Sequence, residues 1–165
     1  MSIDDADIGA TTHAIWSSVL GIELSPLSDM PTEGAEPAST ACILISGDWE
    51  GAVMLQSNTE VARAFVAKMF ESEPADVSPD DFDDGLGELA NLVGGNFKNQ
   101  IGGLCALSLP TVVHGREHIL RVPQSKLLTQ VAFETEGKHL TVSVFERDRG
   151  GAAKRAARPQ DPAPI

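Results

Sequence analysis

Basic side chains are scarce in this 165-residue sequence, which has 12 lysine and arginine residues against 24 aspartate and glutamate residues. The formal net charge at pH 7 is therefore −12. A surface this acidic repels the phosphate groups of nucleic acids and the anionic headgroups of a membrane. We therefore expect the protein to bind neither nucleic acid nor a membrane surface.

Cysteine is also rare, and the two that are present, Cys42 and Cys105, lie in apolar segments without a C-x-x-C pair. Residues 1–5 are acidic, whereas a secretory leader begins with basic and then apolar residues. No aliphatic run approaches the ~20 residues that a membrane-spanning helix needs. These absences predict a soluble, cytoplasmic protein in which both cysteines are small core residues.

Several common enzyme motifs are missing, because the sequence has no P-loop, no G-x-G-x-x-G after a strand and no G-x-S-x-G. Residues 114–118 do fit H-x-x-E-H, the pattern of inverted zinc peptidases. Such a site needs a helix that places both histidines on one face, and a third ligand downstream. The residues around His114 predict a strand and a turn instead. A zinc metallopeptidase with His114 and His118 as ligands is therefore a remote alternative.

Composition changes near the C-terminus. Residues 1–146 contain 7 basic and 22 acidic side chains, whereas residues 147–165 contain 5 basic and 2 acidic ones. The last stretch is rich in glycine, alanine and proline, with too little apolar surface to offset the entropy lost on ordering. We expect residues 1–148 to form one domain and residues 149–165 to be a disordered basic tail.

Hydrophobic residues recur at helical spacing near the N-terminus. A helix is predicted to begin near Asp4 or Asp5, where acidic side chains suit the positive end of the helix dipole, and to end at Gly21. Its predicted apolar face comprises Ile8, Thr12, Ile15, Trp16, Val19 and Leu20.

Two alternating segments, 40–47 and 49–56, predict a β-hairpin. Residues 57–60 then form a capping-box pattern, in which the Ser57 hydroxyl and the Glu60 side chain would bind the first amides of a short second helix.

The C-terminal half of the chain predicts further strands. A strand at 106–113 is interrupted by Pro110, which indicates a sheet edge or a bulge. A second hairpin follows at 126–135 and 138–146. The side chains predicted to share one side of each strand are Leu127, Val131 and Phe133, and Leu140, Val142 and Val144. This order of elements predicts a two-layer α+β fold with helices packed on one face of an antiparallel sheet.

A third helix, with Ser78 and Pro79 as its N-cap and first residue, is predicted over residues 80–104. Glu88 and Asn91 lie three positions apart on its polar face, so their polar ends can reach one external target. The polar face comprises Asp84, Glu88, Asn91, Gly95, Asn99 and Gly102. The predicted buried stripe comprises Phe82, Leu86, Leu89, Val93, Phe97, Ile101 and Leu104.

Six glycines lie in this segment, and each costs about 0.5–1 kcal/mol relative to alanine inside a helix. A kinked pair of helices would explain them, and so would tight packing against the sheet. A functional explanation is that Gly95 leaves room for another macromolecule to approach Glu88 and Asn91. Leu92, an apolar residue beside Glu88, fits such a docking surface.

The pattern Asp84-x-x-x-Glu88-x-x-Asn91, followed by Gly95 and by the Pro-Thr strand at 107–113, resembles the CheC/CheX/FliY chemotaxis phosphatases. The single copy of the pattern is most similar to CheX. The resemblance extends from about residue 5 to residue 146. The family often has a second proline where this sequence has Leu109.

This resemblance implies a CheC-like fold and dephosphorylation of a phospho-aspartyl, CheY-like response regulator. It implies that Asn91 positions the attacking water, that Glu88 contacts a lysine in the regulator's active site, and that Asp84 has a supporting role. We expect the chain to need no cofactor of its own, because the magnesium ion would belong to the regulator. A homodimer formed through edge strands, with residues 126–146 as a candidate edge, is also implied.

A non-enzymatic alternative remains open at this point. The same helix could bind a receiver domain without hydrolysing its phosphate, as an adaptor. The identity of the regulator, within or outside chemotaxis, is open as well.

Overall fold

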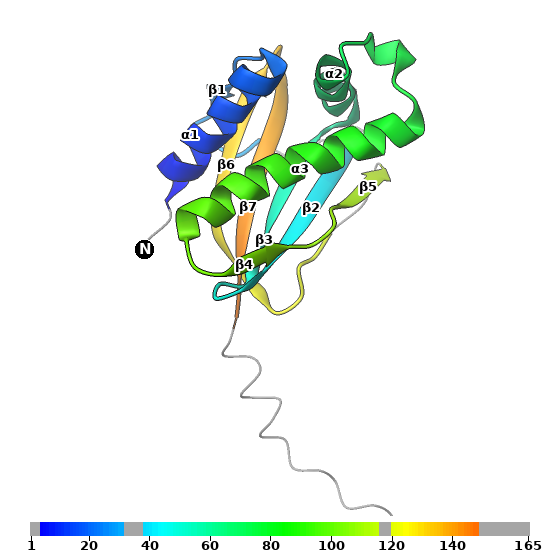
Figure 1. The fold of residues 1–165 in the computed structure, drawn as a ribbon. Helices are drawn as coiled ribbons and strands as arrows, with labels where there is room; N and C mark the ends of the chain where they lie inside the picture. Colours follow the sequence, from blue (N-terminus) through cyan, green and yellow to red (C-terminus); the bar gives the residue numbers. More distant parts are fainter. Residues whose placement is uncertain (1–3, 32–37, 116–119, 149–165) are drawn as a thin grey trace, which may run out of the picture.

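A seven-stranded antiparallel sheet forms one layer of the computed structural model, and helices cover one face of it (Figure 1). The structure describes residues 4–31, 38–115 and 120–148. The strand order is β1-β6-β7-β3-β2-β4, with β5 also paired to β2. The predicted α+β class is therefore confirmed, whereas the predicted tail lies outside the described residues. The strands are β1 (Ser25–Pro26), β2 (Ala38–Gly47), β3 (Gly51–Asn58), β4 (Cys105–Leu107), β5 (Thr111–Gly115), β6 (Ser125–Thr135) and β7 (Lys138–Arg147).

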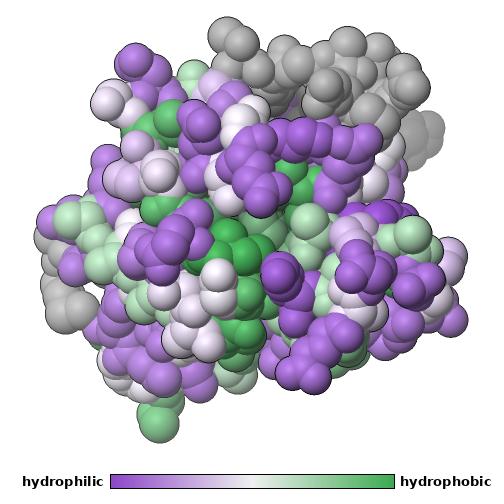
Figure 2. Space-filling model, turned by 90° about the horizontal axis from the view of Figure 1, so that it is seen from above, coloured by the Kyte–Doolittle hydropathy of each residue, from purple (hydrophilic) through white to green (hydrophobic). Residues whose placement is uncertain are grey.

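Three α-helices pack on the sheet in the described residues: α1 (Asp5–Ile15), α2 (Thr59–Met69) and α3 (Pro79–Ile101). A π-helix (Trp16–Leu20) continues α1, and a short 3₁₀ helix (Pro74–Asp76) precedes α3. Seen from above, hydrophilic side chains surround a smaller apolar area near the middle of the face (Figure 2). None of these helices has the length and apolar character needed to cross a membrane.

The first helix begins where the sequence predicts. Asp4 caps it through reciprocal hydrogen bonds with Asp7, and Gly21 ends the continuing π-helix in a left-handed conformation. Trp16 and Leu20 are buried as expected, but Val19 is 45% exposed. The prediction for Val19 was wrong because the wider π-helical turn changes the direction of the side chains after residue 15.

The cap of α2 differs from the prediction. The Asn58 side chain, not that of Ser57, accepts the hydrogen bond from a first-turn amide, that of Glu60. Ser57 still belongs to β3, and its hydroxyl donates to the carbonyl of His139. The strand extends two residues beyond the predicted end, because pairing with β2 and β7 continues there.

The second hairpin, β6–β7, has nearly the predicted bounds. Leu140, Val142 and Val144 face the helices and are at most 1% exposed. Leu127 does not share a side with Val131 and Phe133, because a β-bulge between residues 127 and 129 reverses the alternation, and Leu127 is 51% exposed. Of the candidate edge at residues 126–146, β7 lies between β6 and β3 and is not an edge strand, and β6 lies between β7 and the two-residue β1. The homodimer expected through these residues stays a prediction.

The strand interrupted by Pro110 is confirmed as two short strands, β4 and β5, which both pair with β2. Between them, Ser108 binds β2 at Leu44. The Ser108 amide donates to the Leu44 carbonyl (2.9 Å), and the Leu44 amide donates to the Ser108 hydroxyl oxygen (3.0 Å). The connection therefore holds Pro110 in a fixed position beside α3.

The main core lies between α3 and the sheet. Leu89, Val93 and Phe97 are fully buried there, and Phe82 and Leu86 are nearly so. The predicted stripe ends early, because the backbone leaves the helix at Gly102 and Leu104 is 85% exposed. Full burial of such side chains contributes about 1.5–3 kcal/mol each, so this face of α3 is a rigid support for its outer face.

Candidate functional site

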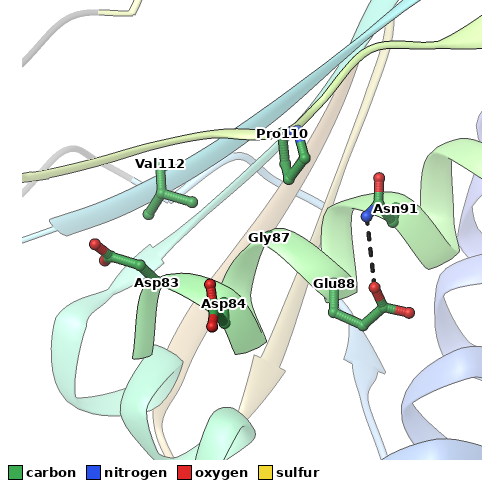
Figure 3. A pocket seen from close by; sticks show the side chains of 7 residues that line it. All are labelled: Asp83, Asp84, Gly87, Glu88, Asn91, Pro110 and Val112. Atoms are coloured by element: carbon green, nitrogen blue, oxygen red, sulfur yellow. Dashed lines mark hydrogen bonds between the residues drawn. The ribbon is translucent and has the colours of Figure 1, made fainter. Parts of the chain in front are cut away.

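A groove of about 520 Å³ lies between α3 and the chain that connects β4 to β5 (Figure 3). One wall is the polar face of α3, and the other is formed by Pro110 and Val112. The structure thus brings three predicted site residues, Asp84, Glu88 and Asn91, to one surface. The full lining is Asp83, Asp84, Gly87, Glu88, Asn91, Pro110 and Val112.

Glu88 and Asn91 lie one helical turn apart, and Asn91 Nδ2 donates to Glu88 Oε2 across 3.4 Å (Figure 3). A hydrogen bond of this length is weak. It aligns the two side chains, and breaking it costs little free energy when one of them binds another partner. Glu88 is exposed and Asn91 is half-buried. The neighbouring Leu89 and Ala90 are fully buried, which fixes the backbone that carries the pair.

The second wall of the groove was not predicted from the sequence. Gly87 makes it possible, because a Cβ atom at this position would lie only 2.9 Å from Pro110 Cγ. The absent side chain lets the proline pack directly on α3. The interruption of the strand by Pro110 was the available signal, but the sequence did not show which part of the helix it would meet.

The other glycines of α3 have different explanations. The helix is continuous from Pro79 to Ile101, so the kinked alternative was wrong. A Cβ at Gly94 would lie 2.6 Å from Ile43 Cγ2 on the sheet, and one at Gly85 would lie 2.6 Å from Val66 Cγ1 on α2. Tight packing therefore accounts for both of these positions.

Gly95 and Leu92 lie on α3 near the pair but do not line the groove. A Cβ at Gly95 would have an ordinary contact at 3.9 Å with Leu107 Cδ1, so internal packing does not require glycine there. Leu92 is half-buried at the margin of the core. Their expected role in contacting a partner stays a prediction.

The groove is strongly acidic. Among the described residues, its lining contains three carboxylates, from Asp83, Asp84 and Glu88, and no lysine, arginine or histidine. Charges of one sign in a concave surface add their potentials and attract groups of the opposite sign. A ligand that fits here would present positive charge.

The H-x-x-E-H segment does not form a helix over its described part. His114 lies on β5, and its ring contacts Asp83 and Ser39. His118 lies outside the described residues. Within the described ranges, no three His, Cys, Asp or Glu residues are placed to hold a metal ion. The zinc-peptidase alternative therefore gains no support from the structure.

Similar folds are known from solved structures. The chemotaxis protein CheX from Vibrio vulnificus is 19% identical, with a TM-score of 0.70 over 86% of this chain and 95% of that one. A putative chemotaxis protein from Desulfovibrio vulgaris Hildenborough is 24% identical, with a TM-score of 0.67 over 88% and 100%. A CheX–CheY–BeF₃–Mg²⁺ complex from Borrelia burgdorferi contains a chain that is 16% identical, with a TM-score of 0.71 over 89% and 99%.

These likenesses concern the fold, and no curated protein matches the sequence significantly. The sequence itself identifies the family, since the model of the family described as chemotaxis phosphatase CheX matches residues 39–134. The match covers more than half of the chain and includes all but the first residue of β2, all but the last residue of β6, and the whole groove between them. The chain therefore belongs to the CheX family of chemotaxis phosphatases.

Proposed function

We propose that this protein dephosphorylates the phospho-aspartate of a CheY-like receiver domain. The observation that carries the proposal is the Glu88–Asn91 pair, which a buried helix presents at the edge of an acidic groove in a CheX-family fold. The CheX chain from Borrelia burgdorferi was solved with CheY, BeF₃ and Mg²⁺, which supports a receiver domain as the partner.

Asn91 would position the attacking water. Its Nδ2 group is directed to Glu88, and Oδ1 points away from that contact (Figure 3). Oδ1 can therefore accept a hydrogen bond from water and turn a lone pair of the water toward phosphorus. Hydrolysis of an acyl phosphate needs little acid or base catalysis, so positioning the water in line is the useful contribution. The long Asn91–Glu88 bond can shorten or open as the partner binds.

Glu88 would orient the receiver. One of its carboxylate oxygens accepts from Asn91, and the other can accept from a lysine ammonium group beside the partner's phosphoryl group. Asp84, one turn earlier in the same groove, would support this contact by its charge. The chain would hold no cofactor of its own. Magnesium bound by the receiver would supply charge neutralisation on the phosphoryl oxygens.

Asn91→Ala tests this proposal through the decay of phosphate on a purified, phosphorylated receiver domain. We expect the variant to lose most of its rate enhancement and to keep its circular-dichroism spectrum, because the side chain is half-buried and makes one long hydrogen bond. Asn99→Ala is the matched control, since it makes the same change on an exposed part of the same helix and should leave the rate unaltered.

The assay also separates the phosphatase from the adaptor alternative. If the parent protein binds the phosphorylated receiver but leaves its decay rate unchanged, the protein is an adaptor and the proposal is refuted. If Asn91→Ala and Asn99→Ala reduce the rate equally, the assigned role of Asn91 is wrong. Glu88→Gln should mainly raise KM, because it removes the charge that orients the partner.

A further inference from the structure

A chain of four polar side chains passes through the buried Ser39 and ends at the groove. Thr59 Oγ1 lies 3.0 Å from Ser39 Oγ, Ser39 Oγ lies 2.9 Å from His114 Nδ1, and His114 Nε2 lies 2.5 Å from Asp83 Oδ1. These residues come from α2, β2, β5 and α3, respectively. Ser39 is 1% exposed, whereas Asp83 lines the groove.

The chemistry of the two ends assigns the protons along this chain. An ionised carboxylate can only accept hydrogen bonds, so His114 Nε2 carries a proton and donates to Asp83. In the neutral ring, Nδ1 then accepts from the Ser39 hydroxyl, whose oxygen accepts from Thr59. When the ring gains a second proton, Nδ1 donates to Ser39, and the Ser39 hydroxyl can turn to donate to Thr59. The Asp83–His114 contact is therefore satisfied in both charge states.

The Asp83–His114 contact joins the two walls of the groove at one end. Among the described strands, β5 pairs with β2 alone, and the contact with Asp83 holds it against α3. The His114 ring also stacks on Phe82, with centroids 4.8 Å apart and planes inclined by 25°. On the same Phe82 ring lies the Arg63 guanidinium of α2, 4.9 Å from the centroid. Val112, two residues before His114 on β5, is part of the groove wall.

We propose that His114 is a positioning residue for receiver docking, which fixes β5 against α3 and holds Asp83 at the end of the acidic groove. This inference rests on the proposed function. It explains the histidine that the zinc-peptidase pattern singled out. Among the described residues, the charged groups near the ring are Asp83 on α3 and Arg63 on α2, which contacts the same Phe82 ring; β2 contributes the uncharged Ser39.

The test measures the Kd for a CheY-like receiver loaded with beryllofluoride and Mg²⁺, with the same receiver and the same low ionic strength throughout. The parent protein is compared with His114→Gln, which can still donate a hydrogen bond to Asp83.

Positioning is tested at pH 8 with His114→Phe, which keeps the stack on Phe82 but cannot bind Asp83. We expect it to bind the receiver at least twofold more weakly than both the parent and His114→Gln. If His114 had a merely structural role, its replacement would lower the stability of the protein, and glutamine at this position would not restore receiver binding. Equal affinity of all three folded proteins overturns the positioning role.

A measurement without the partner separates this inference from the proposed function. In the isolated protein, the ¹⁵N resonance of His114 Nε2 should shift in Asp83→Asn and that of Nδ1 in Ser39→Ala. Unchanged resonances overturn the contact itself. If the resonances shift but the parent binds no receiver, the proposed function fails while the contact stands.

Discussion

Gly94 and Gly95 are adjacent on α3, and the structure predicts opposite effects for the same substitution at the two positions. A Cβ at Gly94 would lie 2.6 Å from Ile43 Cγ2, whereas one at Gly95 would lie 3.9 Å from Leu107 Cδ1. Ile43 is fully buried on β2, and the branch at its Cβ restricts its rotamers, so its methyl group has little freedom to move. Gly94→Ala and Gly95→Ala therefore form a matched pair.

The expected magnitudes follow from helix propensity and packing. Alanine is favoured over glycine by about 0.8–1.0 kcal/mol inside a helix. Gly95→Ala gains this without a clash, so its free energy of unfolding should rise by about 0.5–1 kcal/mol, or its Tm by about 3 °C. Overpacking a core costs about 1–3 kcal/mol, so Gly94→Ala should lose about 1 kcal/mol, within a range of about 0–2 kcal/mol, after the propensity gain is subtracted.

Urea denaturation followed by circular dichroism measures both stabilities, and the phosphate-decay assay measures function on the same samples. Gly95→Ala should be more stable but less active, because its new methyl group lies on the helix face that would meet the receiver. Gly94→Ala as stable as Gly95→Ala would refute the packing argument. Gly95→Ala with a raised stability and unchanged kcat/KM would refute the role of Gly95 in partner approach.

Two further predictions test the core and its titration. Phe97 is fully buried and Leu104 is 85% exposed. In urea denaturation, Phe97→Ala should therefore lower the free energy of unfolding by about 3–5 kcal/mol, whereas Leu104→Ala should change it by less than about 0.5 kcal/mol. Similar losses in the two variants would contradict the helix end at Ile101. Burial raises the pKa of Cys42 from 9.0 to about 11, so the contribution of the neutral thiol to stability is complete below pH 9 and should disappear between pH 9 and pH 11. Urea denaturation at pH 8 and pH 11 should show this as a loss of about 2–3 kcal/mol in the free energy of unfolding. Cys42→Ala should not show this loss.

Local patterns in the sequence predicted the elements of the fold well. The Ser78–Pro79 start of α3 is confirmed, because an N-cap hydroxyl and a first-turn proline act within a few residues of each other. The two hairpins are also confirmed, since alternation along each strand reflects one buried face.

Two of the wrong predictions, for Leu127 and Ser57, share a cause, which is strand pairing with distant partners. The bulge near Leu127 reverses the alternation of side chains between the two faces of the sheet, because β6 pairs with β7 both before and after the bulge. Ser57 is part of β3, rather than the cap of α2, because the strand continues to pair with β2 and β7. Leu104 is exposed because α3 ends at Ile101, where Gly102 can adopt a positive φ of 75°.

The sequence by itself determined that Asp84, Glu88 and Asn91 share one face of a helix, because helical periodicity is a local property of the chain. It also supported the family and the class of fold. Only the tertiary structure decided that Pro110 and Val112 face these residues across a groove, that Gly87 permits this approach, and that His114 reaches Asp83. Those contacts join residues 19 to 31 positions apart, and their geometry depends on how β4 and β5 pair with β2, which no local pattern records.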